Sequence, residues 1–150
     1  MIGKVFKTSD DYSLTLLRLV LGIVFFAHGA QKALGWWGGY GFSGTMQFFT
    51  QTMGIPAVFA FLAIMAEFLG GLGLITGALS RVAAFGIFSV MAVAVLKVHL
   101  PFGFFMNWYG AQKGEGFEYH LLAMAMAAAL VVRGAGALSV DGVLAEKFER

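Results

Sequence analysis

The chain has no cysteine and little charge. Charged side chains make up 12% of its 150 residues, about half the usual share in soluble domains. The lack of cysteine excludes disulfides, thiol relays, Cys-ligated clusters and a CxxC redox pair within this chain. The scarcity of charge excludes a water-soluble globular protein, because the polar groups could not cover its surface. A net charge of +2 gives no support to nucleic-acid binding.

Motifs for the common cofactors are also missing. The sequence has no P-loop, no Rossmann glycine fingerprint and no Ser/His/Asp arrangement. What the chain has instead is apolar sequence: 59% of the residues are hydrophobic, and the mean hydropathy is +0.82. These values indicate an integral membrane protein.

Four apolar segments predict membrane-spanning helices, because a bilayer core requires about 20 mostly apolar residues per helix. Arg18 interrupts the start of the first segment, and no convincing cleavage site follows it, so we expect a retained helix rather than a signal peptide. The expected fold is an all-α, antiparallel four-transmembrane-helix bundle that forms a single membrane domain over residues 1–150. Its helices are expected at about 14–34, 56–78, 81–100 and 117–133.

Two longer connections separate these segments. Residues 35–55 are rich in glycine and aromatics, and Ser43 could cap a short amphipathic helix at about 43–53. Residues 101–116 have a similar composition. Residues 136–141 predict a turn, and residues 142–150 predict a short charged helix or a frayed tail.

The placement of Lys and Arg near the helix ends predicts that both termini are cytoplasmic. In this orientation seven basic residues lie inside and three outside. The inner ones are Lys4, Lys7, Arg18, Arg81, Arg133, Lys147 and Arg150, and the outer ones are Lys32, Lys97 and Lys113. An interfacial aromatic belt would then lie on the outer side, formed by Trp36, Trp37, Tyr40, Trp108 and Tyr109.

Polar side chains cluster, by depth, in the outer half of the predicted bundle. Charged groups inside spanning segments cost about 2.5–3.5 kcal/mol each and usually face the bundle interior. We therefore expect a ligand-binding site whose candidates are His28, Lys32, Glu67, Lys97, His99, Glu118 and His120. Lys32 and Glu67 are expected to meet, directly or through water or His28, and to hold the pocket open. Arg18, Arg81 and Arg133 are assigned structural or topological roles.

Plainer interpretations stay open beside this one. Lys32, Lys97 and Arg133 lie near helix ends and could extend to water instead. The glycines of residues 70–77 are typical of close helix packing. A metal held by the three histidines with Glu67 or Glu118 is the weaker alternative, because no local motif such as HExxH supports it.

The order of several short motifs resembles the DoxX family over most of the chain, from Arg18 to Val143. The matching positions are Lys32, Gly41–Phe42, Gly54–Pro56, Glu67–Gly71, Arg81, His99 and Glu118. The resemblance implies a small four-helix, multi-pass protein of the bacterial inner membrane, of a kind often labelled an oxidoreductase. Some relatives are linked to quinone chemistry and to partner redox enzymes.

Three functions follow as hypotheses. The first is a quinone-linked or small-molecule-binding oxidoreductase component, with a quinone as the candidate ligand and electrons supplied by a partner redox protein, a metal or the substrate. Phe104, Phe105 or Trp108 could cover the ring of the quinone. The second is a non-catalytic membrane subunit that anchors or assembles a partner redox enzyme. The third is a small transporter or proton relay, which would favour a homo-oligomer because four helices make a thin pathway.

Overall fold

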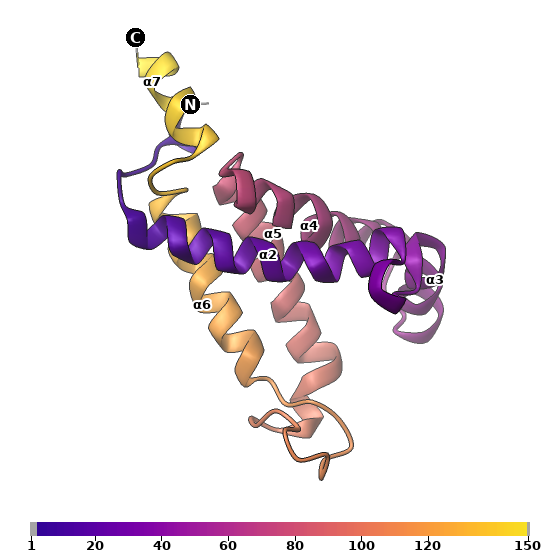
Figure 1. Cartoon of the computed structure of the whole chain (residues 1–150). Coiled ribbons are helices and arrows are strands. Elements are labelled where there is room, and N and C mark those ends of the chain that lie inside the picture. Colours follow the sequence, from indigo (N-terminus) through magenta and orange to yellow (C-terminus); the bar gives the residue numbers. More distant parts are fainter. Residues whose placement is uncertain (1–2, 150) are drawn as a thin grey trace.

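Helices are the only regular elements in the computed structural model, which describes residues 3–149 (Figure 1). They are α1 (Gly3–Phe6), α2 (Tyr12–Leu34), α3 (Gly41–Gln47), α4 (Ala57–Thr76), α5 (Ser80–Ala94), α6 (Glu118–Arg133) and α7 (Val140–Glu149). A π-helical turn, Val95–His99, and a 3-10 turn, Leu100–Phe102, extend α5. The all-α prediction is therefore confirmed for the described residues.

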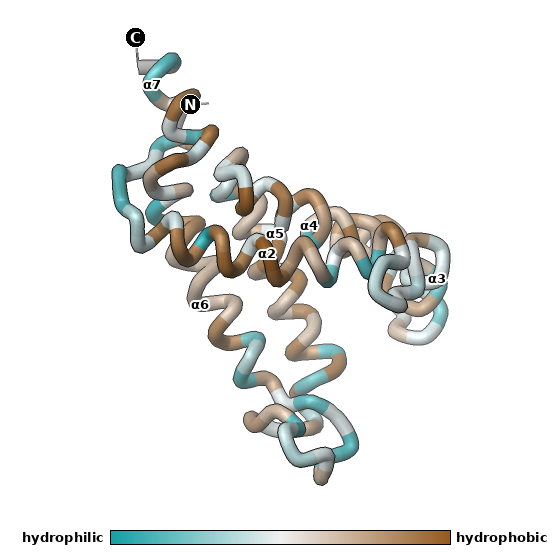
Figure 2. The backbone as a smooth tube through the Cα atoms, viewed as in Figure 1, coloured by the Kyte–Doolittle hydropathy of each residue, from teal (hydrophilic) through white to brown (hydrophobic). Residues whose placement is uncertain are grey.

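Three helices are long and apolar enough to cross a membrane: Tyr12–Leu34, Ala57–Thr76 and Ser80–Phe102. In Figure 2 apolar residues are concentrated along these helices, and polar residues are more frequent in the loops and near the chain ends. The fourth predicted segment does form a helix, but α6 has 16 residues. At 1.5 Å per residue it spans roughly 24 Å, less than the roughly 30 Å of a bilayer core.

The four long helices form two pairs. α2 packs mainly against α4, and α5 packs against both α6 and α4. We call the α2–α4 pair the first arm and the α5–α6 pair the second arm. The arms meet near the α4–α5 turn and extend in different directions from it (Figure 1). Buried side chains fill the core where they meet, including Leu21, Phe25, Leu74, Ile87 and Leu130.

Glycine allows the two helices of the first arm to touch. A Cβ atom added to Gly29 would lie 2.4 Å from the backbone N and Cα of Phe68, and one added to Gly71 would lie 2.4 Å from the backbone N of Phe26. No side chain fits at either position. The predicted packing role of the glycines in residues 70–77 is confirmed at Gly71.

At the end of the molecule where the arms meet, Arg18 joins three segments. The side chain is 1% exposed, and its guanidinium donates hydrogen bonds to the carbonyls of Leu74, Ile75, Ala135, Ala137 and Leu138. Carbonyls in the last turn of a helix have no partner within the helix. Arg18 therefore ties the C-terminal end of α4 to the loop between α6 and α7.

Two other charged groups cap helices nearby. Arg81 donates to the carbonyl of Lys7 and to the last-turn carbonyls of Val131 and Val132 in α6. The Asp141 carboxylate accepts from the backbone N–H groups of Leu79 and Ser80, where α5 begins. The structural role predicted for Arg18 and Arg81 is thus visible as helix capping.

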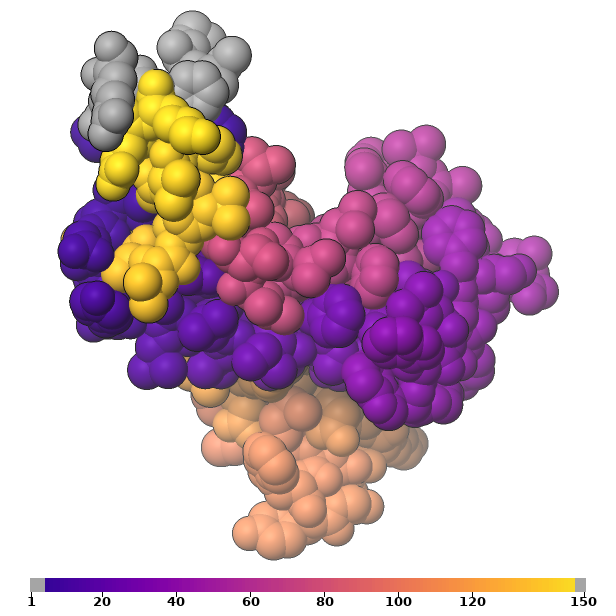
Figure 3. All heavy atoms as spheres, turned by 45° about the horizontal axis from the view of Figure 1, so that its top comes forward, coloured from indigo at the N-terminus to yellow at the C-terminus, as the bar shows by residue number. Residues whose placement is uncertain are grey.

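The ends of the chain lie together. α1 packs against α7, and the two are adjacent in the space-filling view (Figure 3). Of the basic residues that led to the predicted orientation, Arg133 is exposed at the end of α6. Arg150 and the side chain of Lys4 lie outside the described residues.

The predicted short helix at about 43–53 is present with different boundaries. α3 begins at Gly41, and a π-helical turn continues it over Phe48–Thr52. Ser43 does not cap it, because this residue is already inside the helix and exposed. The buried hydroxyl of Thr45 instead donates to the carbonyl of Lys32, which holds α3 against the end of α2.

Asp141→Ala is expected to lower the free energy of unfolding in detergent micelles by about 2–3 kcal/mol, because the charge-assisted hydrogen bonds to the backbone amides of Leu79 and Ser80 are lost. Asp10→Ala is the matched control, since Asp10 is exposed. Chemical denaturation of both variants measures the difference. Equal stability of the two variants would contradict the capping role.

Candidate functional site

A large groove lies between α4 and α5, with a volume of about 1360 Å³. This exceeds the roughly 300–1,000 Å³ typical of small-molecule pockets. Most of its lining is apolar and comes from these two helices, and α2, the π-helical turn before Leu100 and the start of α6 add polar groups. We call it the α4–α5 groove.

The first arm contributes an ion pair to this groove. Lys32 Nζ lies 2.5 Å from Glu67 Oε2, so the predicted contact between these two residues is direct. The Glu67 side chain is 5% exposed and that of Lys32 is 26% exposed. Glu67 is therefore withdrawn into the arm, whereas part of Lys32 remains accessible.

The local sequence explains how the pair forms. Gly29 lies one turn before Lys32 on α2 and touches the backbone of α4 next to Glu67. This close approach brings the start of the Lys32 side chain within reach of the carboxylate. His28 is on the adjacent turn of α2, is exposed, and also lines the groove.

The second arm contributes two histidines. The rings of His99 and His120 lie with centroids 4.0 Å apart. His99 Nδ1 is 2.8 Å from the carbonyl oxygen of Glu115, so this nitrogen carries a proton that it donates. His120 is 5% exposed. The π-helical turn and the first turn of α6 thus place both imidazoles in the groove lining.

Two of the seven predicted site residues lie elsewhere. Lys97 is exposed and is not part of the groove lining. The Glu118 carboxylate accepts hydrogen bonds from the backbone N–H of Met106 and from Trp108 Nε1. Glu118 therefore holds the loop that precedes α6. Of the seven, His28, Lys32, Glu67, His99 and His120 line one groove.

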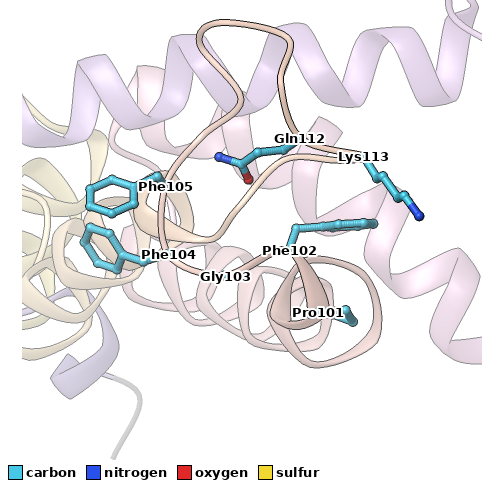
Figure 4. Close-up of a pocket in the computed structure, with 7 residues that line it drawn as sticks. All are labelled: Pro101, Phe102, Gly103, Phe104, Phe105, Gln112 and Lys113. Atoms are coloured by element: carbon cyan, nitrogen blue, oxygen red, sulfur yellow. The ribbon is translucent and has the colours of Figure 1, made fainter.

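The aromatic residues expected to cover a ring ligand are not at the groove. Phe104 and Phe105 line a separate, smaller pocket of about 440 Å³ under the loop after α5, together with Phe102, Gln112 and Lys113 (Figure 4). The groove lining includes Phe48, Phe49 and Met106 instead. The predicted position of Phe104 and Phe105 is wrong because the loop folds onto itself through backbone hydrogen bonds of Gly116 and Phe117.

Tyr119 lines the groove as well and was not among the predicted site residues. Unlike its neighbours Glu118 and His120, Tyr119 carries no charge or imidazole that would mark it as a site residue in the sequence. Among the described residues, no group of three or more His, Asp or Glu side chains could hold a metal ion.

Comparison with known proteins gives consistent matches. The DoxX family model matches residues 13–100. The Bacillus subtilis protein named "Putative oxidoreductase CatD" is 31% identical over 96 residues, which cover 63% of this chain and 66% of CatD. The Escherichia coli protein named "Inner membrane protein YqjF" is 28% identical over 142 residues, which cover 95% of this chain and 99% of YqjF. No solved structure matches the chain significantly.

Proposed function

This chain belongs to the DoxX family, and from that membership and the groove chemistry we propose that it binds a lipid-soluble quinone as a component of an oxidoreductase. The chain is a multi-pass inner-membrane protein. The ligand reaches the α4–α5 groove from the bilayer, because the groove walls are mostly apolar. One similar protein, CatD, bears an oxidoreductase name.

The observation that carries the proposal is the Lys32–Glu67 ion pair on the wall of an apolar groove. Ion pairs withdrawn from water carry a large desolvation penalty and add little to stability over an apolar pair. Ionisable groups inside membrane segments therefore mark functional sites more often than structural ones. The partial exposure of Lys32 leaves its ammonium able to donate a further hydrogen bond.

A quinone matches these groups chemically. Its ring fits between apolar walls, and a carbonyl oxygen accepts hydrogen bonds from Lys32 or His28. Reduction to the quinol consumes two electrons and two protons. The carboxyl group of Glu67 and the imidazoles of the groove lining can carry protons to the ligand. The electrons come from a partner redox protein, since the sequence contains no motif for a cofactor of its own.

The membrane topology is part of the same proposal. α1 and α7 lie together, which supports an even number of bilayer crossings. Three helices qualify as spans, and α6 returns the chain to the starting end as a fourth, shorter crossing. The distribution of Lys and Arg supports a cytoplasmic location for both termini.

Purified protein in lipid nanodiscs is expected to bind a decyl-tailed benzoquinone, and Lys32→Met is expected to weaken binding about tenfold. The loss of a hydrogen bond from a charged donor to a buried acceptor lowers the affinity by roughly this factor. Lys97→Met is the matched control, because Lys97 is exposed and outside the groove lining. Equilibrium dialysis of the labelled quinone measures both.

The absence of saturable binding to the wild-type protein would reject this function. The family alternative would then be a subunit that anchors a partner redox enzyme, and stoichiometric co-purification of a soluble protein in mild detergent would support it. If Lys32→Met and Lys97→Met lose the same affinity for the quinone, the positive charge of the side chain determines binding, and its position in the groove does not.

A further inference from the structure

We propose that Tyr119 and His120 form a second polar subsite, which holds the oxygen at the far end of a ligand bound at Lys32 and Glu67. This inference rests on the function proposed above and specifies the ligand further. The ligand class is a ring that carries two oxygens on opposite sides, so that each arm of the molecule holds one of them.

Two unpaired polar atoms point to this subsite. Tyr119 Oη and His120 Nδ1 are both buried and have no hydrogen-bond partner among the described residues. Buried polar groups in native proteins are nearly always paired, so each exception requires an explanation. Both side chains line the α4–α5 groove, and a ligand in that groove can provide the missing partners.

The two side chains act as one unit. They are consecutive residues in the first turn of α6, and their rings lie 5.3 Å apart with an edge-to-face orientation. The His99 ring also packs against that of His120. Since His99 is held by the carbonyl of Glu115, it supports the position of His120 within the second arm.

The subsite and the ion pair lie on different arms. Lys32 and Glu67 belong to α2 and α4, whereas Tyr119 and His120 belong to α6. All four side chains line the α4–α5 groove. A ligand between them meets hydrogen-bonding groups on both sides.

This arrangement determines the chemistry of the ligand. The Tyr119 hydroxyl donates to a carbonyl or phenolate oxygen, and His120 donates or accepts according to its tautomer. Neither atom is accessible to solvent in the structure. The Tyr119 or His120 ring must therefore rotate toward the groove when the ligand binds. A ring with one oxygen would engage a single arm and gain nothing from the second subsite.

The test compares two probes on one set of variants in nanodiscs. The first probe is a decyl-tailed para-benzoquinone, and the second is a decyl-tailed cyclohexadienone, which has the same ring size but a single carbonyl. Tyr119→Phe removes one hydroxyl and leaves the ring. We expect it to weaken quinone binding about tenfold and to leave the affinity for the dienone unchanged.

The controls separate this subsite from general effects. Tyr109→Phe is the matched control, because Tyr109 is 96% exposed in the loop before α6. It should bind both probes like the wild type. His120→Phe tests the second group of the subsite with the same pair of probes. Thermal unfolding without ligand should show that Tyr119→Phe is no less stable, because the hydroxyl it loses has no partner.

The outcomes are distinguishable. If the wild type binds the quinone through Lys32 while Tyr119→Phe and His120→Phe bind it equally well, the second subsite is rejected and the proposed function stands. If the variants lose affinity for both probes alike, Tyr119 shapes the groove and does not recognise an oxygen. If the wild type binds neither probe, the proposed function fails, and this inference fails with it.

Discussion

Lys32→Met and Glu67→Gln are each expected to lower the free energy of unfolding in detergent micelles by about 3–5 kcal/mol, and the double variant by less than the sum. Each single substitution leaves a charged or polar partner without its counterpart in an apolar arm, whereas the double substitution removes both. The pair is in direct contact, and Glu67 is almost fully withdrawn from the surface. A double-mutant cycle from chemical denaturation measures the coupling.

A second cycle serves as the control. Lys97→Met combined with Glu67→Gln should show additive losses, because Lys97 is exposed and is outside the groove lining. Additive losses for Lys32 and Glu67 as well would contradict an energetic pairing. The idea that the pair also holds the groove open stays a prediction, which ligand binding to the double variant would test.

Gly29→Ala is expected to destabilise the protein by about 3 kcal/mol or more, at the upper end of overpacking effects. The added methyl group would lie 2.4 Å from backbone atoms of Phe68. Backbone cannot turn away as a side chain can, so α2 must move away from α4. This movement should also separate Lys32 from Glu67. Thermal unfolding and quinone binding should therefore both be impaired.

Gly70→Ala on α4 is the matched control. A Cβ at Gly70 would have its nearest neighbour at 3.6 Å, the carbonyl oxygen of Ala83, which is an ordinary contact. This variant should be as stable as the wild type or slightly more stable, because alanine has the higher helix propensity. Similar losses in the two variants would show that glycine flexibility, rather than close approach, matters in this arm.

Several features could be predicted from the sequence because they depend on local composition. Continuous apolar stretches mark a membrane-spanning helix along its whole length. The bounds of α2, α4, α5 and α6 are therefore close to the predicted ones. Lys32 and Glu67 could be paired in advance because helical periodicity and depth are regular along a span. A charged side chain at this depth in the membrane has few possible partners other than a side chain of opposite charge.

Other features depend on contacts between distant segments. Asp141 caps α5 from 61 or 62 positions away in the chain, and no local pattern marks it. Lys97 and His99 are two residues apart, so helical periodicity places them on opposite faces. Only the tertiary structure shows that the face of His99 lines the groove and that the face of Lys97 is exposed.

The sequence by itself determined that this protein resides in a membrane, which segments are helical and which charges need a partner, because apolar transfer and helix geometry act locally. Only the tertiary structure decided how the two arms diverge, that Glu118 serves a loop, and that Tyr119 and His120 line the groove with unpaired atoms. The reason is that helix crossing and loop closure are set by packing between residues far apart in the chain, such as Gly29 against Phe68.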